Sequence, residues 1–128
     1  MRPNASRFLS FKTPRRRLFV DIADAITMIE QFTMGMDLED FRSNPMAVAA
    51  VERKLQIVSE VAFRLGDEAE RCIPDQPWRE IRGIGNHLRH AYERIDLDTI
   101  WAAVTDDLPP LKAAVLREIA ISGNRSEP

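Results

Sequence analysis

Apolar residues recur at helical spacing along nearly the whole chain, and this pattern limits the possible fold more than any other feature of the sequence. The pattern is longest in the segment 45–65, where its members lie three or four positions apart: Val48, Val51, Leu55, Val58, Ala62 and Leu65. A similar stripe predicts a helix over about 16–33. No segment alternates apolar and polar residues as a half-buried strand does. The sequence therefore predicts an all-α protein.

Local capping signals indicate where these helices begin. Asn44 can accept a hydrogen bond from the first turn of the helix over 45–65, and Pro45 suits the first helical position. Pro77 opens a further helix over about 77–93 in the same way. We expect residues 66–77 to form a connector that holds a helical turn.

Aspartates and two prolines mark the last third of the chain. Asp96 or Asp98 can cap a fourth helix over 97–108. Pro109 and Pro110 are expected to kink that helix or to restart it, because they lack the backbone N–H. A chain of 128 residues is long enough for one domain with a core of its own. The predicted fold is an antiparallel four- to five-helix bundle.

The net charge of −2 conceals an uneven distribution. Residues 1–17 hold six Lys/Arg and no acid, so the remainder has 12 Lys/Arg against 20 Asp/Glu, a formal charge of −8. We interpret 1–17 as a basic, flexible arm, which either contacts RNA or an acidic partner or is simply a disordered start. The helical domain is expected over 18–122, and 123–128 is expected to be a frayed tail.

Cysteine use and hydropathy favour a cytoplasmic protein with no membrane partner. The single cysteine, Cys72, cannot form an internal disulfide, which fits a reducing compartment. No apolar run reaches the roughly 18 residues that span a bilayer, and no secretory signal is recognisable. One Cys and two His without clustered acids give no metal motif, and no cofactor is predicted.

The segment 81–92, IRGIGNHLRHAY, concentrates groups that can do acid–base chemistry near neutral pH. It holds both histidines and the only tyrosine of the chain. At about 100° per residue, the core-facing stripe of a helix here consists of Ile81, Ile84, Leu88, Ala91 and Ile95. The opposite side is expected to carry Arg82, Gly85, Asn86, Arg89, His90 and Tyr92. This side is either a solvated helix face or a functional site.

Two details favour a functional site. Gly83 and Gly85 each cost roughly 1 kcal/mol relative to alanine inside a helix, which indicates that something approaches the backbone closely. Asn86 and His90 lie four positions apart, so they share one face. The helix thus gathers an imidazole, an amide and guanidinium groups within reach of one another.

This set of groups suits cleavage of an RNA phosphodiester bond. The 2′-OH must lose a proton and the 5′-oxygen must gain one, and a histidine with an unperturbed pKa of about 6.5 can do either. An arginine offers a planar fork of donors to the charged phosphorane. One chain places only His90 on this face, so an acid and a base together require two copies about a two-fold axis. The chemistry therefore predicts a homodimer with its site in the shared cleft.

Over about 18–115 the chain is similar to the HepT-like branch of the HEPN superfamily. The likeness lies in DIADAI, AVERKLQIVSEVA, PWREIRGIGNHLRHAY and DLDTIWAAVTDDLPPLK, in that order and spacing. The resemblance implies an all-α ribonuclease that acts as a toxin beside a small nucleotidyltransferase antitoxin of the MntA type.

The active motif of that family, commonly RNxxxHxY, implies which residues act here. Asn86, His90 and Tyr92 match it, whereas Gly85 stands where the arginine is expected. Arg89 follows Gly85 by four residues on the same line of the helix, and it can lean back over the space that Gly85 leaves open. Arg82 is a second candidate for the arginine.

One principal hypothesis and two alternatives follow from these residues. The principal one is a metal-independent endoribonuclease toxin, active as a homodimer or a higher oligomer. His90 would move protons, Arg89 with Arg82 would stabilise the phosphorane, and Asn86 would hold the phosphate or the imidazole. As the resemblance implies, the antitoxin would silence the toxin by transferring AMP to Tyr92. The alternatives are a non-catalytic HEPN module, which binds nucleotide or a nucleotidyltransferase, and a plain helical scaffold.

Overall fold

Four long helices form most of the structure, a computed structural model that describes residues 13–90 and 96–124, with the backbone alone at positions 89, 90 and 124. The long helices are α2 (Arg15–Phe32), α4 (Pro45–Leu65), α6 (Trp78–His90) and α8 (Leu108–Asn124). Between them lie α3 (Leu38–Arg42), α5 (Asp67–Cys72), α7 (Leu97–Ala102) and the π-helical turn η1 (Ala103–Asp107). The described residues contain no strand, which confirms the all-α prediction.

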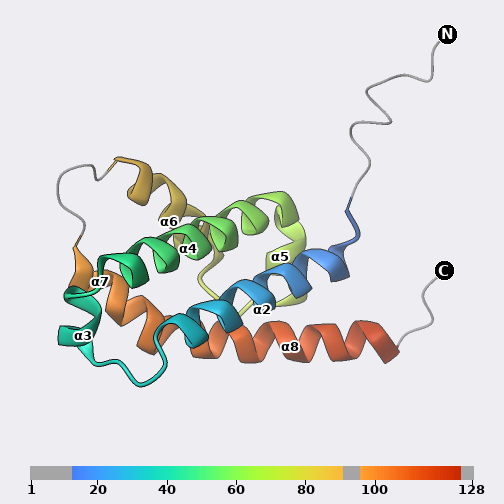
Figure 1. Ribbon diagram of the computed structural model, residues 1–128. Coiled ribbons are helices and arrows are strands. Elements are labelled where there is room, and N and C mark those ends of the chain that lie inside the picture. The colour runs from blue at the N-terminus through green and yellow to red at the C-terminus, as the bar shows by residue number, and fades with distance from the viewer. Residues whose placement is uncertain (1–12, 91–95, 125–128) are drawn as a thin grey trace, which may run out of the picture.

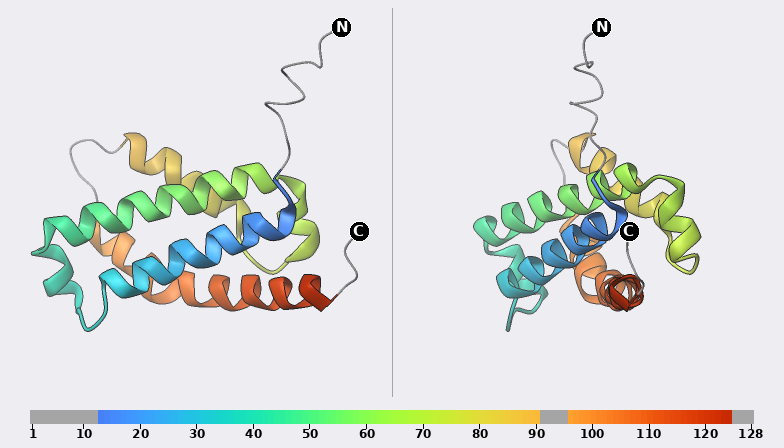
Figure 2. Two further views of the ribbon diagram at one scale, coloured as in Figure 1. Left: turned by 45° about the vertical axis from the view of Figure 1, so that its right-hand side comes forward. Right: turned by 90° about the vertical axis from the view of Figure 1, so that its right-hand side faces the viewer.

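Helix α4 lies at the centre of the packing. It contacts α2 and α6, and α2 in turn contacts α8. Figures 1 and 2 show α4, α2 and α8 side by side and alternating in direction, with α6 lying against α4. The predicted apolar stripes meet in this core, where the buried members include Ile22, Ile26, Ile29, Val51, Leu55 and Val58. The antiparallel bundle is therefore confirmed.

The predicted caps of α4 and α7 are present. The side chain of Asn44 accepts from the backbone nitrogen of Ala47 at 3.0 Å, and Pro45 is the first residue of α4. The carboxylate of Asp96 accepts from the backbone nitrogens of Asp98 and Thr99, at 3.1 and 3.3 Å. These oxygens satisfy N–H groups that the first turn of a helix leaves without a partner.

Pro109 and Pro110 follow a π-helical turn inside a continuous run of helical structure. Helical structure continues from Leu97 to Asn124, and the π-helical turn Ala103–Asp107 comes just before Pro109 and Pro110. A proline cannot donate to the carbonyl four residues earlier, and its ring crowds that carbonyl. The wider π-helical turn gives the two carbonyls room. Figures 1 and 2 show α7 and α8 running in different directions on either side of this turn, as the predicted kink requires.

Both tryptophans seal the bundle. Trp78, at the start of α6, is 1% exposed, and its indole nitrogen donates to the carbonyl of Ile73 at 2.7 Å. The ring of Trp101 packs against Phe41 with a centroid separation of 5.0 Å, which joins α7 to α3. These contacts anchor α6 at its N-terminus and hold α7 against α3.

The helical part runs slightly past both ends of the predicted domain, since α2 begins at Arg15 and α8 ends at Asn124. Residues 1–12 and 125–128, which belong to the predicted arm and tail, lie outside the described residues. Among the helices that are described, none has both the length and the apolar character needed to cross a bilayer.

Candidate functional site on helix α6

A single serine of α4 binds the backbone of α6 at two points. The hydroxyl of Ser59 donates to the carbonyl of Arg82 at 2.7 Å, and it accepts from the backbone nitrogen of Gly85 at 3.1 Å. Ser59 is 2% exposed, so both hydrogen bonds are shielded from water. The contact fixes how far α6 is rotated about its own axis relative to α4.

The guanidinium of Arg82 closes the C-terminal end of α4. Its Nη2 donates to the carbonyl of Gly66 at 2.9 Å, and its Nε donates to that of Ala62 at 3.3 Å. Both Nη atoms also bind the carboxylate of Glu70 in α5, at 2.8 and 2.7 Å. The last carbonyls of a helix attract cations, so Arg82 ties α6 to α4 and α5 at a favourable place.

The ion pair between Arg82 and Glu70 also shifts their ionisation. The hydrogen bond from Arg82 lowers the pKa of Glu70, and the same bond raises the pKa of Arg82. Both groups are therefore charged at neutral pH. Arg82 therefore serves as a link between α6, α4 and α5, and its guanidinium is turned toward these partners.

The core-facing side of α6 is wider than predicted. Ile81 is buried, and Ile84 and Leu88 pack against the core, as the apolar stripe predicts. Gly85 is buried too, against Ser59, so the prediction that it lies on the opposite side is wrong. Its backbone nitrogen lies 3.1 Å from the hydroxyl of Ser59, so this part of α6 lies against α4.

The outward side of α6 carries Gly83, Asn86 and His87, all of which are exposed. Position 90 follows Asn86 by one helical turn, so it falls on this same side of the helix. The side chains of Arg89 and His90, and the whole of Tyr92, lie outside the described residues. Of the predicted site residues that are described, Asn86 faces outward and Arg82 faces α4, so the structure does not bring these two together.

An apolar groove of about 320 Å³ runs beside this outward side, between α6, α7 and α4. Its walls are aliphatic and consist of Leu55, Ile84, Leu88, Ile100 and Ala103. Glu80, His87 and Thr99 supply polar groups to its lining, and Gly83 also borders it. The groove therefore combines apolar walls with a few hydrogen-bonding groups, as small-ligand sites do.

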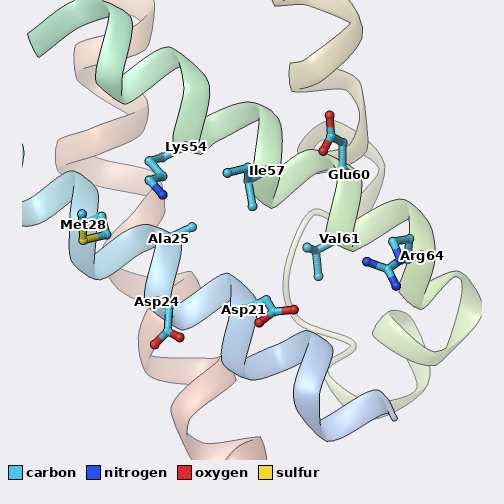
Figure 3. A pocket seen from close by; sticks show the side chains of 9 residues that line it. All are labelled: Asp21, Asp24, Ala25, Met28, Lys54, Ile57, Glu60, Val61 and Arg64. Atoms are coloured by element: carbon cyan, nitrogen blue, oxygen red, sulfur yellow. The ribbon is translucent and has the colours of Figure 1, made fainter. Parts of the chain in front are cut away.

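A second groove, of about 290 Å³, lies between α2 and α4 (Figure 3). Figure 3 shows Asp21 and Asp24 on α2, and Lys54, Glu60 and Arg64 on α4. Asp21 forms an ion pair with Arg17 at 3.2 Å. No residue of α6 lines this groove, so its charges do not belong to the predicted site. Within the described part of the chain, no three His, Cys, Asp or Glu side chains gather as metal ligands would.

Sequence reasoning missed Ser59 and Glu70, which position α6. Ser59 sits beside Val58 on a helix whose buried face is otherwise apolar, and a lone polar residue on such a face is a weak signal of a specific hydrogen bond. Glu70 falls in a segment that was expected to be a connector, although 67–72 forms α5. Nothing in the local sequence indicates that Arg82 reaches it.

An all-α bundle with Asn86 and position 90 on its third long helix has the architecture of a HEPN-like domain. The family described as HepT-like, "Ribonuclease HepT-like", matches residues 22–118. The match covers most of the chain, and the chain therefore belongs to this family.

Relatives agree with this assignment. A protein of Thermococcus cleftensis named "Probable ribonuclease HepT" is 38% identical over 92 residues, which cover 72% of this chain and 84% of that protein. A protein of Methanocaldococcus jannaschii named as a "putative RNase" is 33% identical over 95 residues, 74% of this chain and 87% of its own length. A third, from Caldanaerobacter subterraneus and also named a "putative RNase", is 31% identical over 81% of this chain and 92% of its own. No solved structure matches the chain significantly.

Proposed function

We propose that the protein is a metal-independent endoribonuclease, and that it is the toxin of a cytoplasmic toxin–antitoxin pair. Family membership and the relatives named as ribonucleases support the reaction class. The single observation that carries the proposal is the arrangement of α6. Ser59 and Arg82 hold its inner side against α4, while Asn86 and position 90 share its outer side.

Transesterification explains why these groups are needed. The ribose 2′-oxygen attacks the phosphorus and loses its proton to one imidazole. The bond from phosphorus to the 5′-oxygen breaks, and that oxygen takes a proton from a second imidazole, which leaves a 2′,3′-cyclic phosphate and a 5′-hydroxyl. His90 of each protomer in a homodimer supplies the two imidazoles, so two α6 helices face each other across the cleft.

The phosphorane carries more negative charge than the phosphate, so the site needs a fixed cation and a neutral donor. Arg89 takes the first role, because the guanidinium of Arg82 is bound to Glu70 and to the end of α4. Asn86, exposed one turn before position 90, donates its amide N–H to a phosphate oxygen. Because α6 is fixed against α4, these groups keep their relative positions, as catalysis by positioning requires.

The sequence just after α6 supplies the residue for silencing. We assign Tyr92 as the acceptor of AMP from a cognate nucleotidyltransferase. The phenol oxygen forms a bond to the α-phosphorus of ATP, loses its proton, and pyrophosphate leaves. The added phosphate and nucleoside would fill the cleft with bulk and negative charge, which excludes RNA.

One observation favours a second candidate. Gly85 replaces the motif arginine, and its N–H is bound to Ser59 rather than exposed. A HEPN module that binds nucleotide or a nucleotidyltransferase without cutting RNA would need no arginine there.

Cleavage of labelled RNA in EDTA separates the two candidates. We expect the purified full chain to produce fragments that end in a cyclic phosphate, and we expect His90→Ala and Arg89→Ala to lower the rate at least a hundredfold. Arg53→Ala, an exposed arginine on α4, is the matched control and should cut normally. A wild-type protein that binds RNA without cutting it would make the second candidate correct.

A further inference from the structure

Gly83 lies in the middle of α6, where a glycine costs helix stability and no described residue requires one. Glycine is the poorest helix former apart from proline, and the backbone of Gly83 is helical rather than left-handed. A Cβ built at this position would meet nothing within 4 Å. The described fold therefore gives no reason to exclude a side chain here.

The place of Gly83 in the structure offers a reason for a glycine at this position. Gly83 borders the groove between α6, α7 and α4, and it also lies on the outward side of α6 together with Asn86. Gly83 thus lies at the edge of the groove, where no side chain separates the groove from Asn86. A larger side chain would stand between them, whereas a glycine leaves an open passage and a flat stretch of backbone.

The groove has the size and chemistry of a site for one flat ring. Its volume of about 320 Å³ exceeds that of a single base, and its walls include Ile84 and Ile100. Glu80 and His87 also line it, two turns apart on α6. A carboxylate accepts hydrogen bonds from an exocyclic amino group, and an imidazole can donate or accept at the edge of a base.

We propose that this groove is a nucleobase subsite, which receives the base next to the phosphate at Asn86 and prefers a base with an exocyclic amino group. The proposal rests on the proposed function for its choice of ligand. A nucleotide that crosses α6 at Gly83 reaches Asn86 three residues further along the helix, a rise of about 4.5 Å. That rise is shorter than the span of one nucleotide, so base and phosphate can be bound together.

Binding of labelled RNA decamers in EDTA tests this subsite without any need for cleavage. The probes are decacytidine, decauridine and an abasic decamer, and the protein carries His90→Ala so that no strand is cut. We expect decacytidine to bind at least about tenfold more tightly than the abasic strand, because only a strand with bases can bury a ring against the aliphatic walls of the groove. Gly83→Met should abolish that difference, and Gly83→Ala should reduce it. Glu80→Gln should remove the preference for decacytidine over decauridine.

Stability measurements separate a lost ligand from a lost fold. Gly83→Ala should raise the melting temperature, because alanine favours a helix and nothing obstructs its Cβ. Gly123→Ala, the same change in α8, is the matched control and should bind all three probes as the parent does. A gain in stability together with a loss of base-dependent binding is the result that supports the subsite.

Two results would overturn the subsite. One is a Gly83→Met protein that still prefers decacytidine to the abasic strand. The other is an equal loss of affinity for all three probes together with a fall from dimer to monomer in sedimentation, which would make the groove a contact between copies. If base-dependent binding depends on Gly83 while the wild type cuts no RNA, the subsite stands and the ribonuclease proposal fails.

Discussion

The hydroxyl of Ser59 lies 3.1 Å from the backbone nitrogen of Gly85, inside the contact between α4 and α6. The same hydroxyl donates to the carbonyl of Arg82 at 2.7 Å, so one side chain holds two points of the neighbouring helix. Because α6 is a rigid helix, this contact also sets the direction in which Asn86 and position 90 face. The site therefore depends on a hydrogen bond that lies on the far side of its helix.

Ser59→Ala is expected to lower the free energy of unfolding by about 1–2 kcal/mol, the usual cost of a buried hydrogen bond. Urea unfolding followed by circular dichroism measures this change. Ser43→Ala is the matched control, since that exposed hydroxyl binds carbonyls of its own short helix, at 2.8 Å to Glu39 and 3.3 Å to Asp40. Equal midpoints for Ser59→Ala and Ser43→Ala would contradict the role of Ser59.

Arg82→Lys tests whether the planar fork at the end of α4 is needed. A lysine keeps the charge but cannot bind two carbonyls and a carboxylate at once, so we expect a loss of about 2 kcal/mol for Arg82→Ala and most of that loss for Arg82→Lys. Arg53→Ala, on the exposed side of α4, should change the free energy of unfolding by less than about 0.5 kcal/mol. Full stability of the lysine variant would show that charge alone suffices.

The pKa of Glu70 gives the ion pair a predictable pH dependence. The hydrogen bond from Arg82 lowers this pKa in the folded state, so folding favours the ionised carboxylate. The stabilisation is present above the pKa of the unfolded chain and is lost as pH falls through the lower, folded value. Glu70→Gln should therefore be less stable than wild type at neutral pH, and the difference should vanish in acid. A difference that grows in acid would contradict this assignment.

Glu52 should show the opposite dependence. Burial raises its pKa, and its Oε2 has no hydrogen-bond partner among the described residues. Folding thus favours the protonated form, and this stabilisation is lost as pH rises through the folded pKa. Glu52→Gln should be more stable than wild type at neutral pH and equal to it in acid, as measured by urea midpoints at several pH values. Arg53→Ala, a change at the exposed position next to Glu52, is the control for this comparison of urea midpoints.

The elements that the sequence predicted correctly depend on neighbours in the chain. The cap at Asn44 and the start at Pro45 are read within one turn, and so is the cap at Asp96. The contacts that orient α6 join residues far apart: Ser59 with Arg82 across 23 positions, and Ser59 with Gly85 across 26. No local pattern encodes such pairs.

The misplacement of Gly85 has a related cause. A helical wheel locates the core side by apolar side chains, and a glycine has no side chain to count. In the structure the core-facing side of α6 includes Gly85, which is buried and binds Ser59 of α4 through its backbone nitrogen. Family likeness gave the motif residues, but the angle at which α6 meets α4 came from the structure.

The two glycines of α6 offer a last prediction, because the same substitution should act in opposite directions at positions 83 and 85. Leucine improves helix propensity by roughly 1 kcal/mol at either position. At Gly83 no atom of the described residues lies within 4 Å of the new Cβ, so Gly83→Leu should raise the free energy of unfolding by up to that amount. Gly85 is buried and its backbone nitrogen binds Ser59, so a leucine there has to be fitted into the contact with α4, and Gly85→Leu should lower the free energy of unfolding by about 1–3 kcal/mol, as overpacking does. Urea unfolding of both variants without RNA decides the matter, and a Gly85→Leu protein as stable as Gly83→Leu would show that α4 does not pack on position 85.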